Sequence, residues 1–163
     1  MIAKLKRKDR IQTPVIDPAE FMTEGDVENK LVYPFLVHPN FLGIPHEWVR
    51  SKEYMEPTDI DKGAGKRYGY IPDYSVWRSG FPLLVVESKR PDEPIEQALR
   101  EAHLDANRIN NRYPPNINPI SHVLACNGEQ FALARSDSEA EVLYARLRTC
   151  DPAPTSSRPS RRS

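Results

Sequence analysis

Hydrophobic and polar positions between Tyr70 and Pro91 predict two short strands. β-prone segments lie on both sides of Arg78-Ser79-Gly80, and Pro and Gly punctuate both ends of the stretch. That arrangement favours a pair of adjacent antiparallel strands. The second segment contains a continuous apolar run from Leu83 to Val86, which is typical of a strand buried on both faces.

Two helices are predicted from apolar residues at helical spacing. In the first, these residues are Val27, Leu31, Phe35 and Leu36. They follow Thr23-Glu24-Gly25-Asp26, which resembles a capping box, so we expect a helix from about Glu24 to Val37, bent or shortened near Pro34. In the second, they are Ile95, Leu99, Ala102, Ala106 and Ile109. This stripe predicts a helix from about Pro94 to Asn111.

The remaining pattern completes an α/β domain. A weak strand signal covers residues 48–54, and strands are expected at 120–125 and 130–135, joined by the turn-forming Asn127-Gly128. Residues 139–147 suggest a short closing helix. The order is helix, three strands, helix and two strands (α-β-β-β-α-β-β), which predicts a mixed central β-sheet flanked by helices.

Length and composition indicate one globular domain. The chain has 163 residues, of which 39% are hydrophobic and 28% charged, which is enough for a genuine core. We expect a basic N-terminal arm at 1–20, a folded domain at 21–150 and a disordered Pro/Ser/Arg tail at 151–163. The start has no apolar signal region and no run is long enough to span a membrane, so a cytoplasmic location is expected.

Charge, cysteines and glycine spacing argue against a uniformly basic protein, a disulfide-rich scaffold and an ATP site. The formal net charge is zero, so a nucleic-acid partner would have to be contacted by the basic ends and by local patches. Cys126 follows an apolar run and is predicted to be a core strand residue, while Cys150 starts the tail; a disulfide scaffold is not supported. Gly63-Ala64-Gly65-Lys66 lacks the spacing of a P-loop, which argues against an ATP site.

Candidate chemistry is concentrated in the predicted hairpin. Glu87 and Lys89 are two residues apart and would point to one face of their strand, with Ser88 pointing to the other. Asp73 lies fourteen residues before Glu87, so a hairpin that closes near Ser79 would bring the two acids together. A carboxylate and an ammonium at the end of a buried strand are costly unless something there uses them.

This group suits metal-assisted attack of water on a phosphodiester. Asp73, Glu87 and the backbone carbonyl of Ser88 would supply the oxygen ligands that Mg²⁺ prefers. Lys89 would orient or help deprotonate the water, or stabilise charge on the phosphate. The alternative is an ordinary surface strand ending in a Glu-Lys pair; the apolar run directly before Glu87 argues against it.

Pro72-Asp73 and Glu87-Ser88-Lys89 resemble the PD-(D/E)XK nuclease superfamily. A longer ordered set of matches narrows the resemblance to the N-terminal nuclease domain of type I restriction enzyme R subunits, over roughly residues 21–131. That set is Asp61-Lys62-Gly63, Tyr70 to Tyr74, Val86 to Pro91, Glu101-Ala102, Asn116 to Pro119 and Asn127-Gly128. The resemblance implies a restriction-endonuclease-like core.

The resemblance also implies roles for residues on both helices. An acidic residue of the first helix would reach the metal site, and this is Glu24, with Glu28 as the competitor. Many relatives carry a Gln or Glu and a Tyr four residues apart on the second helix. The corresponding pair here is Glu101 and Asp105, so the Tyr is absent; Gln97 with Glu101 is the other register.

The resulting expectation is a Mg²⁺-dependent DNA endonuclease domain, with Mn²⁺ as a possible substitute. Asp73 and Glu87 would bind metal, Lys89 would serve the water or the transition state, and Glu24 would assist. The resemblance implies DNA and the helicase, methylation and specificity subunits of a restriction complex as partners. Two alternatives stay open: a non-catalytic DNA-binding or assembly module that keeps the fold, and a metal-dependent enzyme acting on RNA or a nucleotide.

Overall fold

The computed structural model describes residues 14–54, 71–138 and 140–149. Most of the predicted arm, the predicted tail, Asp61-Lys62-Gly63 and Tyr70 lie outside these residues. The elements are β1 (Val15–Ile16), η2 (Pro18–Glu20), α1 (Glu24–Asp26), η3 (Val27–Val32), α2 (Tyr33–Val37), η4 (His46–Trp48), β2 (Val49–Ser51), β3 (Tyr74–Arg78), β4 (Phe81–Ser88), α4 (Ile95–Asn110), β5 (His122–Cys126), β6 (Gln130–Arg135), β7 (Val142–Arg146) and β8 (Arg148–Thr149).

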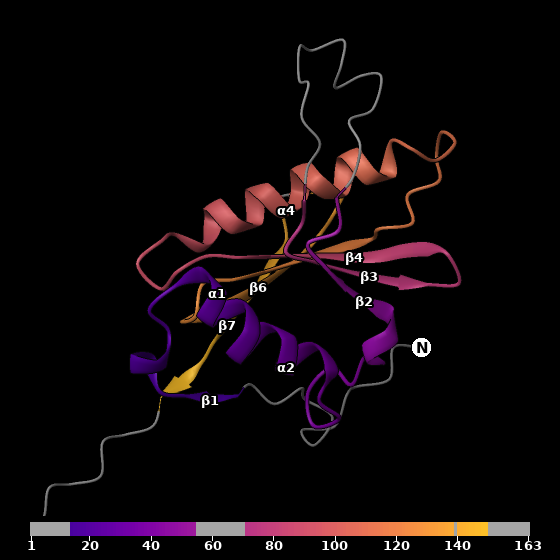
Figure 1. The fold of residues 1–163 in the computed structure, drawn as a ribbon. Coiled ribbons are helices and arrows are strands. Elements are labelled where there is room, and N and C mark those ends of the chain that lie inside the picture. The colour runs from indigo at the N-terminus through magenta and orange to yellow at the C-terminus, as the bar shows by residue number, and fades with distance from the viewer. Residues whose placement is uncertain (1–13, 55–70, 139, 150–163) are drawn as a thin grey trace, which may run out of the picture.

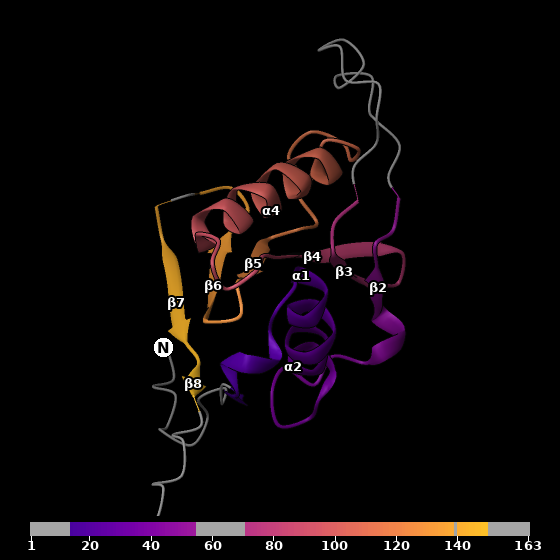
Figure 2. The same cartoon turned by 60° about the vertical axis from the view of Figure 1, so that its left-hand side comes forward.

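Six of these strands form one mixed sheet in the order β2-β3-β4-β5-β6-β7. β4 and β5 are parallel, and the other neighbours are antiparallel. The parallel pair requires a crossover, which α4 provides. α4 covers one face of the sheet, and the continuous helical segment α1-η3-α2 lies against the other (Figures 1 and 2). The fold is therefore an α/β sandwich compatible with the restriction-endonuclease-like class expected from the sequence.

The two helical layers create two cores. Successive strand residues point to opposite faces of the sheet, so Val85 and Val123 pack under α4, whereas Val86 and Leu124 pack under the α1-η3-α2 layer. All four are 4% exposed or less. The predicted burial of β4 on both faces holds for Val85 and Val86 but not for Leu83, which is exposed.

The first predicted helix has the expected limits but an unexpected shape. Residues 24–37 are helical throughout, with a capping box between Thr23 and Asp26. Between Val27 and Val32 the helix widens into a π-helical segment, in which the backbone N–H of Tyr33 bonds to Glu28 five residues earlier. The helix then continues through Pro34 rather than stopping there. π-helical segments are rare, occur mostly as single turns inside α-helices, and are frequent at functional sites.

The predicted closing helix at 139–147 is wrong, because this segment contains strand β7. β7 pairs antiparallel with β6, with Leu143 opposite Leu133. The run Val142-Leu143-Tyr144 has β-branched and aromatic side chains that suit a strand, and pairing with the edge of β6 decides the outcome. The order therefore ends in three sheet strands instead of two. At the other end of the sheet, the weak strand signal corresponds to β2.

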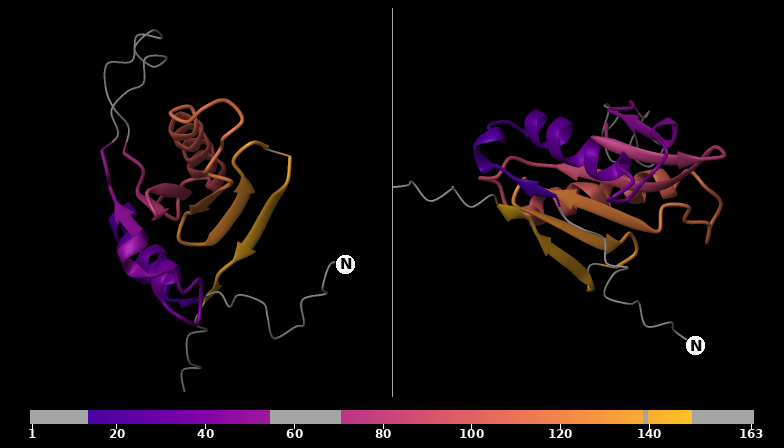
Figure 3. Two further views of the ribbon diagram at one scale, coloured as in Figure 1. Left: turned by 90° about the vertical axis from the view of Figure 1, so that its right-hand side faces the viewer. Right: turned by 90° about the horizontal axis from the view of Figure 1, so that it is seen from below.

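The turn between β5 and β6 lies close to the first helix and to the segment that follows β4. Asn127-Gly128 forms the predicted hairpin turn, and Gly128 has φ of 81°, in the left-handed region that favours glycine. A Cβ at Gly128 would lie 3.0 Å from Pro91 Cγ and 3.2 Å from Val27 Cγ2. Figure 3 shows the strands and helices around this end of the sheet from two further directions. Within the described residues, the helices fall short of the length and apolar character needed to cross a membrane.

Candidate metal centre

The centre of the site is the end of the β3–β4 pair. Tyr74 is opposite Val86 in the ladder, so the preceding residue, Asp73, reaches the level of Glu87. One oxygen of Asp73 accepts a hydrogen bond of 2.7 Å from the backbone N–H of Ser88. Asp73 is only 5% exposed. The hairpin therefore fixes the Asp73 carboxylate beside the backbone of β4, in the position expected from the sequence.

The start of the first helix brings two more acids to the same place. The Thr23 hydroxyl oxygen accepts from the backbone N–H of Asp26, and the Asp26 carboxylate accepts from the backbone N–H of Thr23. This capping box sets the first turn, which contains Glu24. Glu28 follows one turn later, inside the π-helical segment, where the Tyr74 hydroxyl donates to its backbone carbonyl at 3.3 Å.

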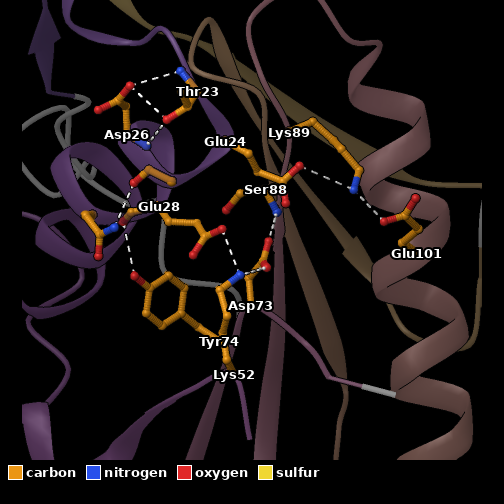
Figure 4. Close-up of polar contacts among 12 residues, drawn as sticks. Thr23, Glu24, Asp26, Glu28, Lys52, Asp73, Tyr74, Ser88, Lys89 and Glu101 are labelled. Carbon is orange, nitrogen blue, oxygen red and sulfur yellow. Dashed lines mark hydrogen bonds and ion pairs between the residues drawn. The ribbon is translucent and has the colours of Figure 1, made fainter. Parts of the chain in front are cut away.

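Glu24, Glu28 and Asp73 form a three-carboxylate cluster, called the acidic cluster from here on (Figure 4). One oxygen from each residue lies within 4.8 Å of the other two. Carboxylate oxygens converging from separate elements are the ligands that Mg²⁺ and Mn²⁺ prefer. Within the described residues, this is the one place where three side chains of types that bind metals lie close enough to share an ion.

The acidic cluster is partly neutralised by Lys52, just after β2. The Lys52 ammonium lies 2.9 Å from an oxygen of Glu28 and 2.9 Å from an oxygen of Asp73. Its backbone N–H also donates to the Asp73 carbonyl at 3.0 Å. Burial lowers the pKa of Lys52, but hydrogen bonds to the two carboxylates outweigh this effect and raise the pKa. Lys52 is therefore a protonated ammonium at neutral pH.

Glu87 lies on the α4 side of the sheet, next to Asp105. Burial, followed by the negative charge of Asp73, raises the pKa of Glu87. Burial also raises the pKa of Asp105, although Arg108 and a hydrogen bond with Glu87 oppose this. Two neighbouring buried carboxyl groups with raised pKa values disfavour being ionised together, and Arg108, 3.0 Å from Asp105, favours the proton on Glu87. We call Glu87 and Asp105 the acid pair.

One oxygen atom of Glu87 is evidence for a cation site nearby. Glu87 Oε1 is buried and has no hydrogen-bond partner in the described part of the chain. A buried acceptor without a partner is costly, and a divalent cation between Glu87 and Asp73 would satisfy it. The residues present thus fit a divalent metal in their chemistry and in this unsatisfied oxygen.

Lys89 links the acidic cluster to helix α4. Its ammonium lies 2.7 Å from Glu101 and 3.8 Å from Glu24. Burial lowers the pKa of Lys89, but the hydrogen bond with Glu101 and the charge of Glu24 raise it above its ordinary value. Burial raises the pKa of Glu24, opposed by Lys89. Lys89 is thus held by one acid from each helical layer, as Figure 4 shows.

A cavity opens beside the acid pair. Its volume is about 240 Å³, and it is lined by Ile71, Glu87, Glu101, Leu104, Asp105 and Arg108. The lining is mainly charged, with apolar edges from Ile71 and Leu104. This composition suits a polar group or solvent next to the carboxylates more than an apolar ligand.

The predicted site residues are gathered at one end of the sheet, on both of its faces. Asp73 lies with Glu24, which was expected, and also with Glu28, which was its competitor; both acids belong to the acidic cluster. Glu87 faces α4 and is not one of the three clustered acids. The metal-binding roles of Asp73, Glu87 and Ser88 and the catalytic role of Lys89 stay predictions.

The second helix supplies two contacts at the site. Glu101 pairs with Lys89, and Asp105 with Glu87, so the register that aligned Glu101 and Asp105 with the resembled motif places both acids at the site. Gln97, the other register, has its amide 3.3 Å from Glu101 instead. Sequence reasoning missed Lys52 entirely. The sequence around Lys52 gave only a weak strand signal, and no pattern showed which other strand this segment would pair with.

Comparison with protein families finds a match at residues 55–141, just over half of the chain, to the family described as type I restriction enzyme R protein N terminus. The chain belongs to this family. The type I restriction R-protein N-terminal domain is a PD-(D/E)XK-like nuclease domain, which agrees with the resemblance found from the motifs. Comparison with the curated proteins and with solved structures gives no significant match.

Some residues of the site lie inside the family match and others lie before it. Asp73, Glu87 and Lys89 fall inside the matched residues. Glu24, Glu28 and Lys52 precede them. The first helix therefore contributes two of the three acids of the acidic cluster, and the residue after β2 their counter-ion, from outside the region that defines the R-protein family match.

Proposed function

We propose that this R-protein N-terminal domain is a Mg²⁺-dependent endonuclease that hydrolyses DNA phosphodiester bonds, with Mn²⁺ able to replace Mg²⁺. The observation that carries the proposal is the convergence of Glu24, Glu28 and Asp73 within 4.8 Å of one another. Glu87, with its unpartnered buried oxygen, and Lys89 lie around the same strand end. Membership of a nuclease-like family supports this choice of reaction.

A bound divalent metal would polarise the phosphate and lower the pKa of an attacking water. Asp73 and Glu87, with the Ser88 backbone carbonyl, would hold it, and Glu24 and Glu28 would complete its surroundings. Ser88 fixes Asp73 through a backbone N–H, so this carboxylate is oriented before any ion arrives. Such preorganisation reduces the cost of arranging charges during the reaction.

Lys89 would act on the water or on the phosphate. Its raised pKa keeps the ammonium protonated at neutral pH, so it is suited to stabilise negative charge that develops on the phosphate oxygens. Glu101 and Glu24 hold the ammonium from two sides. An ammonium fixed in this way stabilises the transition state without an entropic cost at the moment of reaction.

The test is cleavage of supercoiled plasmid DNA by the purified chain with Mg²⁺ or Mn²⁺. We expect nicked and linear products, and we expect Asp73→Ala, Glu87→Ala and Lys89→Ala each to abolish them. Asp137→Ala is the matched control, because Asp137 is an exposed acid that pairs with Arg135 away from the site. Circular dichroism checks that each variant is folded. Cleavage by all three site variants at the wild-type rate would refute the assignment.

One observation favours a second candidate, a non-catalytic DNA-binding or assembly module. Lys52 already supplies a positive charge to Glu28 and Asp73, as would be expected of a nuclease fold whose metal site has lapsed. Wild-type protein that fails to cut plasmid but binds DNA in a salt-sensitive manner would establish this alternative. Replacing the plasmid with single-stranded RNA in the same assay tests an RNA substrate.

Within a type I restriction system, the domain would work with other subunits. We propose that it receives DNA from the helicase part of an R subunit and assembles with methylation and specificity subunits, in the cytoplasm. The family description supports an R-subunit context. Co-purification of tagged protein with these subunits would test the assembly.

A further inference from the structure

We propose that the Lys52 ammonium is a built-in counter-ion of the acidic cluster, and that a divalent cation must displace it to bind. The inference rests on the proposed metal centre. It concerns a residue outside the family match, so it is carried by the contacts of this chain alone.

The first argument is the use of the same oxygens. Lys52 Nζ lies 2.9 Å from Glu28 Oε1 and 2.9 Å from Asp73 Oδ1. Magnesium binds oxygens at about 2.1 Å, so an ion on these two atoms would lie at most about 5 Å from Nζ on whichever side it approached. On the side of Lys52 the two cations would overlap. On the other side they would repel strongly in a partly buried site.

The second argument is the burial of the acids. The side chains of Glu28 and Asp73 are both 7% exposed. Two buried carboxylates this close are costly without a compensating charge. Lys52 compensates them in the metal-free protein, and a divalent ion would do so more completely.

The third argument is that Lys52 can leave. Its side chain is 53% exposed, so Lys52 has solvent beside it into which the ammonium can turn. Lys89 differs, because its side chain is 11% exposed and is held between Glu101 and Glu24. Of these two lysines, Lys52 is therefore the exchangeable cation, and Lys89 stays in place.

The backbone of Lys52 is specialised for this contact. Lys52 has φ of 47°, in the left-handed region that costs energy for a residue with a Cβ. The hydrogen bond from its N–H to the Asp73 carbonyl holds this conformation just after β2. The strained residue is thus anchored to the chain segment that carries the acid it neutralises, as Figure 4 shows for the side chains.

The experiment is calorimetric titration of Mn²⁺ into the full chain at pH 7, comparing wild type with Lys52→Met. We expect Lys52→Met to bind Mn²⁺ at least about tenfold more tightly, because no ammonium has to be displaced. The control is Lys30→Met, because Lys30 is similarly exposed and pairs with Asp26 outside the acidic cluster. Lys30→Met should bind Mn²⁺ as wild type does.

Each outcome decides the matter. Tighter binding by Lys52→Met, or binding by that variant alone, supports the inference. Equal or weaker binding by Lys52→Met, with clear binding by wild type, overturns the inference and leaves the metal centre intact. Absence of binding in both proteins refutes the metal centre, and the inference falls with it.

A second measurement avoids any dependence on the folding of the variant. Wild-type protein labelled with ¹³C at the lysine Cε atoms is titrated with diamagnetic Mg²⁺ and followed by NMR. We expect the Lys52 signal to move towards the position of a free lysine, while the Lys30 signal stays unchanged. A Lys52 signal that is unmoved when calorimetry shows Mg²⁺ saturation overturns the inference.

Discussion

Two groups of buried carboxylates lie on either side of the same strand end, and they are neutralised differently. The acidic cluster, on the side of the first helix, is balanced by the Lys52 ammonium. The acid pair, on the α4 side, is balanced by protonation, favoured because burial raises the pKa of Glu87, and by the Arg108 guanidinium, which lies 3.0 Å from Asp105. Buried charge is compensated in both places, by a lysine cation in the acidic cluster and by protonation together with Arg108 in the acid pair.

The difference determines how each group would respond to a metal ion. The acidic cluster can exchange one cation for another without changing its protonation. The acid pair has to release a proton before its oxygens can act as anionic ligands, which makes its contribution depend on pH. Asp73 connects the groups, because it belongs to the acidic cluster and its charge also raises the pKa of Glu87.

The largest expected effect comes from Asp73, the acidic-cluster residue whose charge also acts on the acid pair. Asp73→Asn should reduce cleavage by at least about a hundredfold, the scale for loss of one preorganised charged group. The asparagine keeps the shape of the side chain but removes a charge that belongs to the acidic cluster and acts on Glu87. Single-turnover plasmid cleavage measures the effect, with Asp137→Asn as the control. A variant that cuts within about threefold of wild type would show that Asp73 is not central.

The protonation of Glu87 in the acid pair can be tested in the absence of a metal. Burial raises the folded-state pKa of Glu87 to about 9, above its unfolded value of 4.5. The folded state therefore binds more protons than the unfolded state between these values, and stability falls as pH rises through this window. In EDTA, Glu87→Gln should match wild type near pH 5 and exceed it by about 1–3 kcal/mol near pH 9.

Urea denaturation at the two pH values measures this difference. Histidines and other titrating groups are common to both proteins, so the comparison isolates Glu87. Identical pH dependence for wild type and Glu87→Gln would mean that Glu87 is ionised in the folded protein, and the contrast between the two carboxylate groups would disappear.

A smaller effect is expected from the contact that positions Lys89. Glu101→Gln removes the carboxylate 2.7 Å from the Lys89 ammonium. Because that hydrogen bond raises the pKa of Lys89, its loss should lower the pKa and move the alkaline limit of the cleavage profile to lower pH. We expect kcat to fall by about tenfold at neutral pH, the low end for a group that orients another. A reduced rate with an unshifted pH profile would point to a purely structural role.

The smallest effect should come from Tyr74→Phe. This change removes the hydroxyl that donates to the Glu28 backbone carbonyl at 3.3 Å and leaves the ring in place. A single neutral hydrogen bond contributes about 0.5–1.5 kcal/mol to stability. Thermal unfolding should therefore show a modest decrease, with Mn²⁺ affinity nearly unchanged. A large loss of Mn²⁺ binding would show that this contact sets the position of the acidic cluster.

Local patterns predicted the central hairpin and its acids well. The turn near Ser79 and the alternation along β4 place Asp73 level with Glu87, and the register of Tyr74 with Val86 agrees with this. Glu24 and Glu28 are four residues apart, a spacing that puts two helix residues on one face. The sequence left them as alternatives, and the structure places both in the acidic cluster.

Contacts between distant segments could not be predicted in this way. Lys52 reaches Asp73 because β2 pairs with β3, and no local pattern indicates a pairing across more than twenty residues. The segment at 139–147 had charged residues compatible with a helix, but the open edge of β6 selects a strand. The π-helical segment around Glu28 likewise had no signal in the sequence pattern.

Gly128 makes the spacing of the whole centre sensitive to a turn that carries none of its chemistry. Pro91 is two residues beyond Lys89, and Val27 lies between Glu24 and Glu28 in the first helix; both come within 3.2 Å of where a Cβ on residue 128 would be. A larger side chain at residue 128 would push apart the segment that follows Lys89 and the helix that carries Glu24 and Glu28. Substitution of Gly128 is thus restricted by the short distance to Pro91 and Val27 as well as by its positive φ angle.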